Sequence, residues 1–588
     1  MSLTARLLSV GLAASVLAGV VVAPAGSAVA TAAGDVTSQQ EAERVDRVPT
    51  PELKWYACYG RAQCATVRLP LDYDEPDGES VEIALLRVKA RKQASRIGSL
   101  FVNPGGPGGS GTDMAAMAAG FLSDSVLDRF DVVGFDPRGI GASDNVKCFS
   151  STREQVAAQK QLNKFFPYGA VEEAAYAKTA RAIGRACSTT GAALAGAMST
   201  AEAARDLDVL RRAVGDAKLT YLGFSYGTVL GQYYANMFPD RVRALALDGV
   251  VNPKSWTGGP ANQGSLQDDR LRSADAAYRA LRELLIRCNR AGAKRCAFAG
   301  GDPQRHFAAI ARALRAKPLV LGRPEDGPTA RLTYADFIGL TLTGLYSADA
   351  GEFVTSLAAV VETLLAAPAG KTAKQRSVAL AQLRAHLSRV RTPARDFLYD
   401  NSVEAYSGVI CTDADHPQAT TLWPALTAAE DARAPYFGRA WGWGTVFCAG
   451  DTWTVRDEDA YRGPFSRHTG APVLFVGNTW DPATSYRQAM SAARLLPGSR
   501  LLSSDNWGHT AYGTSTCVTT AVDRYLLRGT LPAAGTVCHS PIQPFTGRVP
   551  GLLMASAAAQ SAPADAKQLP PVAGPYAGSS PLLPVRRP

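Results

Sequence analysis

The chain has 588 residues, of which 46% are hydrophobic and 19% are charged, and its formal net charge is +10. This length exceeds what one compact core normally holds, so we expect two packed units or one core with a large insertion. The composition excludes a membrane-embedded or wholly disordered protein. Lys and Arg are scattered without a run of five or six, which argues against a nucleic-acid partner.

Residues 1–30 have the features of a secretory signal peptide. Arg6 gives a positive start, an apolar run covers residues 7–22, and Ala-Val-Ala at 28–30 supplies the small residues of a cleavage site. A membrane anchor is disfavoured because the run is short, interrupted by glycine and followed by Pro24. No later segment reaches the roughly 18 uninterrupted apolar residues of a membrane span. We therefore expect a secreted, extracellular protein without stable membrane insertion.

Residues 31–48 are polar and form either a propeptide or a flexible segment, and the folded core begins at about residue 49. Within 65–90 the segments ATVRLPLDY and VEIALLRVKA alternate as the strands of an antiparallel hairpin do. Short apolar runs that end in small residues then follow in GSLFVNPGG, FDVVGFDPRG, LTYLGFSYG and RALALDGV. Such runs are typical of buried parallel strands, and their alternation with helices predicts an α/β sheet over residues 49–250. Functional groups gather beyond the carboxyl ends of such strands.

The strand pattern fades over residues 251–469, where amphipathic segments such as SADAAYRALRELLIRC predict a helical cap. It resumes in APVLFVGNTWD and SRLLSSDNWGH, so residues 470–545 form the second part of the same core. A mostly parallel sheet with a large helical insertion is the fold that this order predicts. Residues 555–588, rich in Pro, Ala and Ser, are expected to form a disordered tail.

The ten cysteines are even in number, and an exported chain allows them to pair. Sequence alone leaves their connectivity open. We predict that neighbours along the chain pair, which closes five local loops. No CxxC motif and no cluster of histidines accompanies them, so no metal site is expected. The predicted pairs are Cys58 with Cys64, Cys148 with Cys187, Cys288 with Cys296, Cys411 with Cys448, and Cys517 with Cys538.

The segment GFSYG, residues 223–227, fits the pattern GxSxG, in which a serine lies on a tight turn between a strand and a helix. Its flanking residues must be small because the chain doubles back there, and the turn exposes the hydroxyl above the sheet. The strand-like KLTYL precedes it and the helical TVLGQYYANM follows it. The alternative is a purely structural serine in a glycine-rich turn. The context favours Ser225 as a nucleophile.

A serine nucleophile requires a base, and the base requires an orienting acid. In this type of fold the acid and then the histidine follow the serine along the chain. Of the six histidines, only His509 in DNWGHT follows a late strand and opens a small-residue turn. Asp481, just past the preceding strand, is the first choice of acid, although it also fits a turn before Pro482. Asp505 is only the second choice, because it lies too near His509 along the chain to be the first.

The loop NPGGPGGSG, residues 103–111, follows a predicted strand and is a candidate donor of backbone N–H groups. A tetrahedral intermediate needs such donors, and we predict those of Gly106 and Tyr226, the residue after the nucleophile. A phosphate-binding loop is the competing interpretation. It is disfavoured because the loop lacks a GK[ST] ending and its prolines carry no N–H.

Five segments together resemble the proline iminopeptidase-like α/β-hydrolases, and within them the secreted actinobacterial tripeptidyl aminopeptidases. The segments are NPGGPGGSG, FDPRGIGASD, GFSYGTVLGQYYANMFPDRVRALALDGVVNP, GNTWDPAT and NWGHT, and the resemblance extends from about Trp55 to Cys538. It implies an α/β-hydrolase fold whose cap is inserted before the acid-bearing strand. It also implies a serine exopeptidase, with Ser225, Asp481 and His509 as the catalytic triad. Arg138 matches a family arginine that we interpret as structural.

One departure separates this chain from strict proline iminopeptidases, which usually carry His-Gly-Gly-Pro-Gly where residues 104–108 read PGGPG. The difference favours the tripeptidyl branch. An aminopeptidase must also bind the substrate ammonium, which calls for carboxylates in a partly desolvated cap pocket. Glu404 and Asp413, in NSVEAYSGVICTDAD, are the candidates.

We therefore expect a monomeric serine aminopeptidase that acts on peptides with free N-termini and needs no cofactor. An esterase or lipase with the same triad is the first alternative, since fold and triad do not choose between amide and ester bonds. A prolyl aminopeptidase that releases single residues is another. A non-catalytic binding module on a hydrolase scaffold is disfavoured by the complete Ser, Asp and His set.

Overall fold

The computed structural model describes residues 34–321, 331–366, 373–389 and 399–546. The predicted signal peptide and the predicted C-terminal tail lie outside these residues. Within them, no helix combines the length and the apolar character that crossing a membrane requires.

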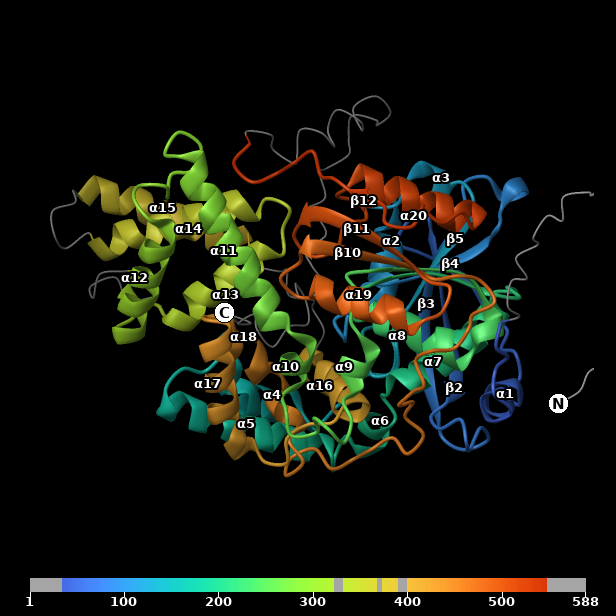
Figure 1. Cartoon of the computed structure of the whole chain (residues 1–588). Helices are drawn as coiled ribbons and strands as arrows, with labels where there is room; N and C mark the ends of the chain where they lie inside the picture. The colour runs from blue at the N-terminus through green and yellow to red at the C-terminus, as the bar shows by residue number, and fades with distance from the viewer. Residues whose placement is uncertain (1–33, 322–330, 367–372, 390–398, 547–588) are drawn as a thin grey trace, which may run out of the picture. The chain divides into compact units, whose positions relative to one another are not determined.

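A ten-stranded sheet forms the centre of the α/β part, in the order β1-β2-β3-β5-β4-β6-β7-β10-β11-β12 (Figure 1). The predicted hairpin is confirmed, because β2 and β3 pair antiparallel over eight residue pairs. From β5 to β12 neighbouring strands run parallel, as the buried apolar runs predict. The strands are β1 (Tyr56–Cys58), β2 (Ala62–Pro70), β3 (Ser80–Val88), β4 (Gly98–Asn103), β5 (Phe130–Phe135), β6 (Leu219–Phe224), β7 (Val242–Asp248), β10 (Leu474–Trp480), β11 (Arg500–Trp507) and β12 (Val537–Cys538).

Helices cover both faces of this sheet and bury one apolar cluster on each (Figure 1). On one face lie α2 (Gly111–Ala116), α3 (Asp124–Leu127) and α20 (Thr516–Arg528). On the other lie α7 (Thr200–Ala213), α8 (Gly227–Met237) and α19 (Tyr486–Leu495). The central strands β4, β5 and β6 are fully buried along their whole length, so they read as continuous apolar runs rather than alternating ones.

A long helical insertion separates two strands that are neighbours in the sheet. β7 pairs directly with β10, yet residues 249–473 lie between them in sequence. The predicted helical cap is therefore an insertion into one sheet. Its helices are α9 (Pro253–Thr257), α10 (Gln267–Leu271), α11 (Ser273–Ala291), α12 (Pro303–Ala316), α13 (Tyr334–Leu345), α14 (Ala350–Ala366), α15 (Ala373–Arg389), α16 (Ser402–Asp413), α17 (Trp423–Arg433) and α18 (Phe437–Gly442). A short ladder of β8 (Leu319–Val320) and β9 (Arg331–Leu332) accompanies them.

A second helical segment joins this insertion, although we assigned its residues to the first part of the core. It contains α4 (Thr152–Gln159), α5 (Ala170–Cys187) and α6 (Ala192–Gly196), and α16 packs against both α5 and α6. The side-chain amide of Gln155 donates to Glu404 of α16 over 2.9 Å. The helical part therefore combines two insertions, one after β5 and one after β7.

The segment predicted as a propeptide or flexible stretch contains a packed helix, α1 (Gln39–Asp46). Ser38 caps it by accepting the N–H of Glu41, and α1 packs against α7. The Glu41 carboxylate receives the buried Arg205 guanidinium over 2.9 Å. The packed helix α1 therefore contradicts a flexible segment at these residues. Removal of residues 31–48 as a propeptide stays a prediction.

All five predicted disulfides are confirmed, each joining neighbouring cysteines along the chain. The interpretation of Arg138 as structural also agrees with its contacts. Its guanidinium is buried and donates to Asp206 and Glu202 of α7, and to the backbone carbonyl of Pro70 at the end of β2. Arg138 thus ties the loop after β5 to α7 and β2.

Candidate active site

Ser225 lies on the turn between β6 and α8 in a left-handed backbone conformation, with φ = 55°. Such a φ is uncommon for a residue with a side chain and marks a tight, strained turn. The glycines on either side are sterically required. A Cβ on Gly223 would lie 2.5 Å from the Gly227 carbonyl oxygen, and one on Gly227 would lie 2.8 Å from the Asn103 carbonyl oxygen. The GxSxG pattern therefore has the physical basis that the sequence predicted.

His509 and Asp481 lie at the carboxyl ends of neighbouring strands and are joined by a hydrogen bond. The His509 Nδ1 donates to Asp481 Oδ2 over 2.8 Å, and both side chains are fully buried. Asp481 Oδ1 accepts the backbone N–H groups of Ala483 and Thr484, and its Oδ2 also accepts the Thr484 hydroxyl, each at 2.8 Å. These donors fix the carboxylate, which in turn orients the imidazole.

The His509 Nε2, on the opposite side of the ring, has no hydrogen-bond partner among the described residues. The same part of the chain shows no hydrogen bond between His509 and Ser225. Catalytic hydrogen bonds of this type are often long without substrate and tighten when it binds. An imidazole with an orienting carboxylate at Nδ1 and a free Nε2 is arranged to accept a proton.

Asp248, at the end of β7, connects the Ser225 turn to the His509 loop. Its backbone carbonyl accepts the Ser225 N–H over 2.9 Å, and its Oδ2 accepts the N–H groups of Ala511 and Tyr512. Burial raises the pKa of Asp248 to about 6. Sequence reasoning missed this residue, although an aspartate that ends a buried strand, in RALALDGV, is a usable signal.

The Asn103–Gly111 loop approaches the nucleophile turn closely enough to exclude side chains. A Cβ on Gly105 would lie 2.3 Å from the Phe224 carbonyl oxygen, and Gly105 and Gly106 have φ values of 89° and 114°. Gly106 and Tyr226 line the same pocket as Ser225, and neither backbone N–H donates a hydrogen bond to another described residue. Two such N–H groups beside the serine are suited to stabilise an oxyanion.

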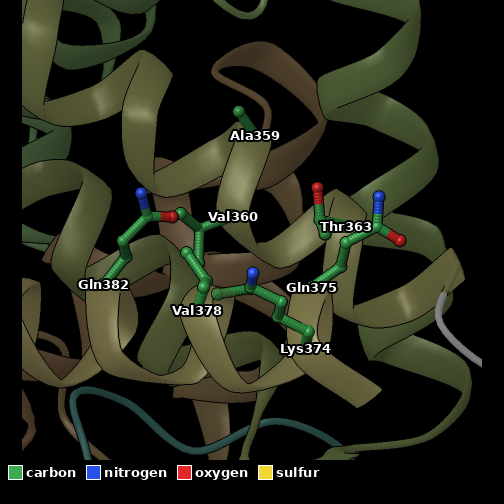
Figure 2. Close-up of a pocket in the computed structure, with 8 residues that line it drawn as sticks. Ala359, Val360, Thr363, Lys374, Gln375, Val378 and Gln382 are labelled. Carbon is green, nitrogen blue, oxygen red and sulfur yellow. The ribbon is translucent and has the colours of Figure 1, made fainter. Parts of the chain in front are cut away.

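Side chains of the helical part cover Ser225. The pocket that contains Ser225 is also lined by Trp256, Asp268, Tyr406 and Trp441, and Ser225 is only 3% exposed. A larger cavity of about 430 Å³ lies between α14 and α15 (Figure 2). Its lining side chains include no carboxylate, histidine or serine, so it cannot hold a Ser-His-Asp triad.

Asp505, the second choice of acid, lies in a different environment. Its carboxylate accepts His539 Nδ1 over 2.8 Å and the backbone N–H of Ser540. It therefore pairs with another histidine, and the structure brings Asp481, not Asp505, to His509.

The two candidate amine-binding carboxylates do not line the pocket of Ser225. Glu404 accepts hydrogen bonds from Gln155, Gln159 and Tyr399, and Asp413 accepts them from Thr200 and Trp256. Both lie on α16 and are at most 1% exposed. A buried helix thus uses these carboxylates for internal contacts.

Burial raises the pKa of Glu404 to about 7 from an ordinary value of 4.5, which makes a testable prediction. Between these pH values the native carboxyl holds a proton that the unfolded chain has lost, so wild-type stability falls as the pH rises. Glu404→Gln removes this titration. Its free energy of unfolding relative to wild type should therefore rise by about 3 kcal/mol from pH 4.5 to pH 7.

Urea unfolding of both proteins at several pH values measures this difference. An offset between them that stays constant over that range would show that Glu404 titrates normally, as a solvent-facing carboxylate does.

The family model described as "alpha/beta hydrolase fold" matches residues 98–281, and the one described as "TAP-like protein" matches residues 434–538. Together they contain Gly106, Ser225, Asp481 and His509.

Three curated relatives match most of the chain. Serine protease Hip1 of Mycobacterium tuberculosis is 33% identical over 82% of this chain and 88% of its own length. Tripeptidyl aminopeptidase of Streptomyces lividans is 30% identical over 81% of this chain and 83% of its own. Carboxylesterase B of M. tuberculosis is 31% identical over 84% and 91%. The chain therefore belongs to the α/β-hydrolase family of TAP-like serine hydrolases that includes the tripeptidyl aminopeptidases and Hip1.

Proposed function

We propose that this protein is a secreted serine exopeptidase that acts at free N-termini and releases tripeptides through an acyl-enzyme. The observation that carries the chemistry is the placement of Ser225, the His509–Asp481 pair and two free backbone N–H groups just after the carboxyl ends of parallel strands in one sheet. The likeness to the Streptomyces lividans tripeptidyl aminopeptidase supports the peptide product.

In the proposed reaction, His509 Nε2 accepts the Ser225 proton while Oγ attacks the scissile carbonyl carbon. The N–H groups of Gly106 and Tyr226 bind the oxyanion, and Asp481 stabilises the imidazolium through Nδ1. His509 then donates its proton to the departing amine, which leaves Ser225 esterified by the N-terminal fragment. A water molecule, deprotonated by His509, hydrolyses this ester and restores the enzyme. The reaction needs only these protein groups and water.

Exopeptidase action is supported by the layer of side chains that covers the nucleophile Ser225. Ser225 is almost fully buried beneath side chains of the helical part, including Trp256 and Trp441. A folded or internal stretch of substrate would have to pass through this layer on both sides of the scissile bond. A chain end needs only one opening, so the cover favours cleavage near a terminus.

Export is supported by the N-terminal segment and by the five disulfides. Disulfides persist in oxidising compartments and are rare in the cytosol. The described residues contain no free cysteine. All ten cysteines are thus used for cross-links that a reducing compartment would open.

Mass spectrometry of a defined peptide mixture incubated with the enzyme tests this proposal. We expect products shortened from the N-terminus in steps of three residues, with N-acetylated peptides cleaved far more slowly. Steps of one residue would instead indicate the prolyl aminopeptidase alternative, and cuts at internal positions would contradict an exopeptidase.

An esterase is the second candidate, because Carboxylesterase B is also a relative of this chain. The same nucleophile, base and oxyanion donors hydrolyse esters and amides. Nitrophenyl esters of short fatty acids and peptide anilides, compared by kcat/KM, separate the two. An esterase should hydrolyse the acyl esters efficiently and leave peptides with free and acetylated N-termini equally untouched.

A further inference from the structure

Asp268 presents an unpaired carboxylate to the pocket of Ser225. It lies on α10, lines the pocket together with Ser225 and Gly106, and is only 6% exposed. Within the described residues, its side chain makes no hydrogen bond and no ion pair. Buried carboxylates are normally paired, and none of the described residues supplies a partner for this one.

The neighbouring arginines do not provide that partner. The Arg270 guanidinium donates to the backbone carbonyl oxygens of Ser255, Ser265 and Asp415 over 2.9 to 3.1 Å. Its donors are therefore directed to the backbone. The next residue, Asp269, behaves differently, because its carboxylate pairs with Arg433 over 2.6 Å. Of these two adjacent aspartates, only Asp268 is left unpaired.

Glu430 of α17 adds a second unpaired carboxyl to this region. It is 3% exposed, and neither of its oxygens has a hydrogen-bond partner among the described residues. Burial, followed by the charge of Asp268, raises the pKa of Glu430 to about 9. A Cβ on Gly442, the residue after Trp441 of the pocket wall, would lie 2.9 Å from Glu430 Oε2. Glu430 therefore lies behind this wall, near enough to Asp268 for their charges to interact.

The chemistry of this pair restricts what can bind. An anionic group would be repelled by the Asp268 carboxylate, and two carboxyl groups supply too few oxygens for Ca²⁺, which takes six to eight. A primary ammonium carries one positive charge and three N–H donors, and it compensates a buried carboxylate well. The site faces the same pocket as the nucleophile, so a cation bound there can belong to the substrate.

We infer that Asp268, with Glu430 behind it, forms the subsite that binds a primary ammonium group of the peptide substrate. The inference rests on the proposed function, since it places a peptide in this pocket. Two groups share the chemistry, the α-ammonium of a free N-terminus and the ε-ammonium of a lysine side chain. In either case the subsite selects substrates by one positive charge held at a set position relative to Ser225.

Asp268→Asn tests the inference, because it keeps the size and removes the charge. The substrates are Ala-Ala-Ala p-nitroanilide, its N-acetyl form, and N-acetyl-Ala-Ala-Lys p-nitroanilide. If the α-ammonium binds there, kcat/KM for the free peptide should fall about 100-fold while the acetylated alanine substrate is unaffected. If the lysine ammonium binds there, the loss should appear with the lysine substrate alone. The matched control, Asp269→Asn, should change each value less than twofold.

Equal effects of Asp268→Asn on charged and uncharged substrates would overturn the inference. Inhibition of the wild-type enzyme by butylammonium and by butanol gives a reading that does not depend on a variant folding. Butylammonium should compete with substrate at least tenfold more strongly than butanol, and equal inhibition would also overturn the inference.

The proposed function is judged separately, by the mass-spectrometric analysis of peptide products described above. If tripeptides are released from N-termini but Asp268→Asn affects charged and uncharged substrates equally, the inference alone is wrong. If the enzyme cuts at internal positions after lysine and Asp268→Asn weakens the lysine substrate alone, the proposed function alone is wrong.

Discussion

Ser225→Ala should lower kcat by about 10⁵- to 10⁶-fold, the loss seen when the nucleophile of a serine hydrolase is removed. The physical reason is that the neighbouring hydroxyls cannot replace it, because Tyr226 bonds to Thr200 and Thr228 donates to the Ser225 carbonyl. Acyl transfer to the enzyme is therefore abolished. Hydrolysis that remains would come from water attacking a substrate held by the backbone N–H groups. Steady-state rates on a tripeptide anilide measure the effect.

Ser491→Ala is a suitable control for this experiment. Its hydroxyl is exposed and donates only to the Arg487 carbonyl of its own helix, so its removal should leave kcat unchanged. Thermal unfolding of the Ser225 variant should occur near the wild-type temperature, since only one oxygen is lost. A Ser225 variant that retains its full biological effect would favour the non-catalytic binding module instead.

Asp481→Asn should lower kcat by about 10⁴-fold with little change in KM. An aspartate in this position accepts four hydrogen bonds, from Ala483, from the backbone and hydroxyl of Thr484, and from His509. An asparagine has a single acceptor oxygen, and its NH₂ turned toward Nδ1 would hold the tautomer whose Nε2 carries the proton. Such an imidazole cannot accept the proton of Ser225.

Asp505→Asn is the matched control, because Asp505 was the second choice of acid and also binds a histidine. That histidine, His539, is largely exposed, whereas His509 is fully buried. The Asp505 variant should therefore keep kcat within twofold. A larger loss with Asp505→Asn than with Asp481→Asn would contradict the assignment of the acid.

The sheet and the nucleophile turn could be predicted because local sequence determines them. Buried parallel strands appear as short apolar runs, and the crowding at Gly223 and Gly227 leaves no room for larger residues. The order of serine, acid and histidine then follows from strand order, since β6, β7, β10 and β11 are consecutive neighbours in the sheet. The disulfides could be predicted because each closes a loop of at most 39 residues.

The pocket could not be predicted in the same way. Asp268 and Glu430 are more than 150 residues apart, and only the packing of α10, α17 and α18 brings them together. Glu404 and Asp413 were chosen by residue type, but whether a carboxylate faces solvent, a pocket or an internal donor is decided by tertiary contacts. The helices after β5 were assigned to the core because amphipathic segments do not reveal which partner they cover.

Labelling by tripeptidyl phosphonates tests the central claim most directly, because these reagents react irreversibly with an activated serine. One reagent carries a free N-terminus and the other an acetylated one, and peptide mass spectrometry locates the label. We predict that the label lies on Ser225 and that the free reagent inactivates the enzyme at least 100-fold faster. Label on another residue, or equal rates for the two reagents, would contradict a serine exopeptidase that recognises free N-termini.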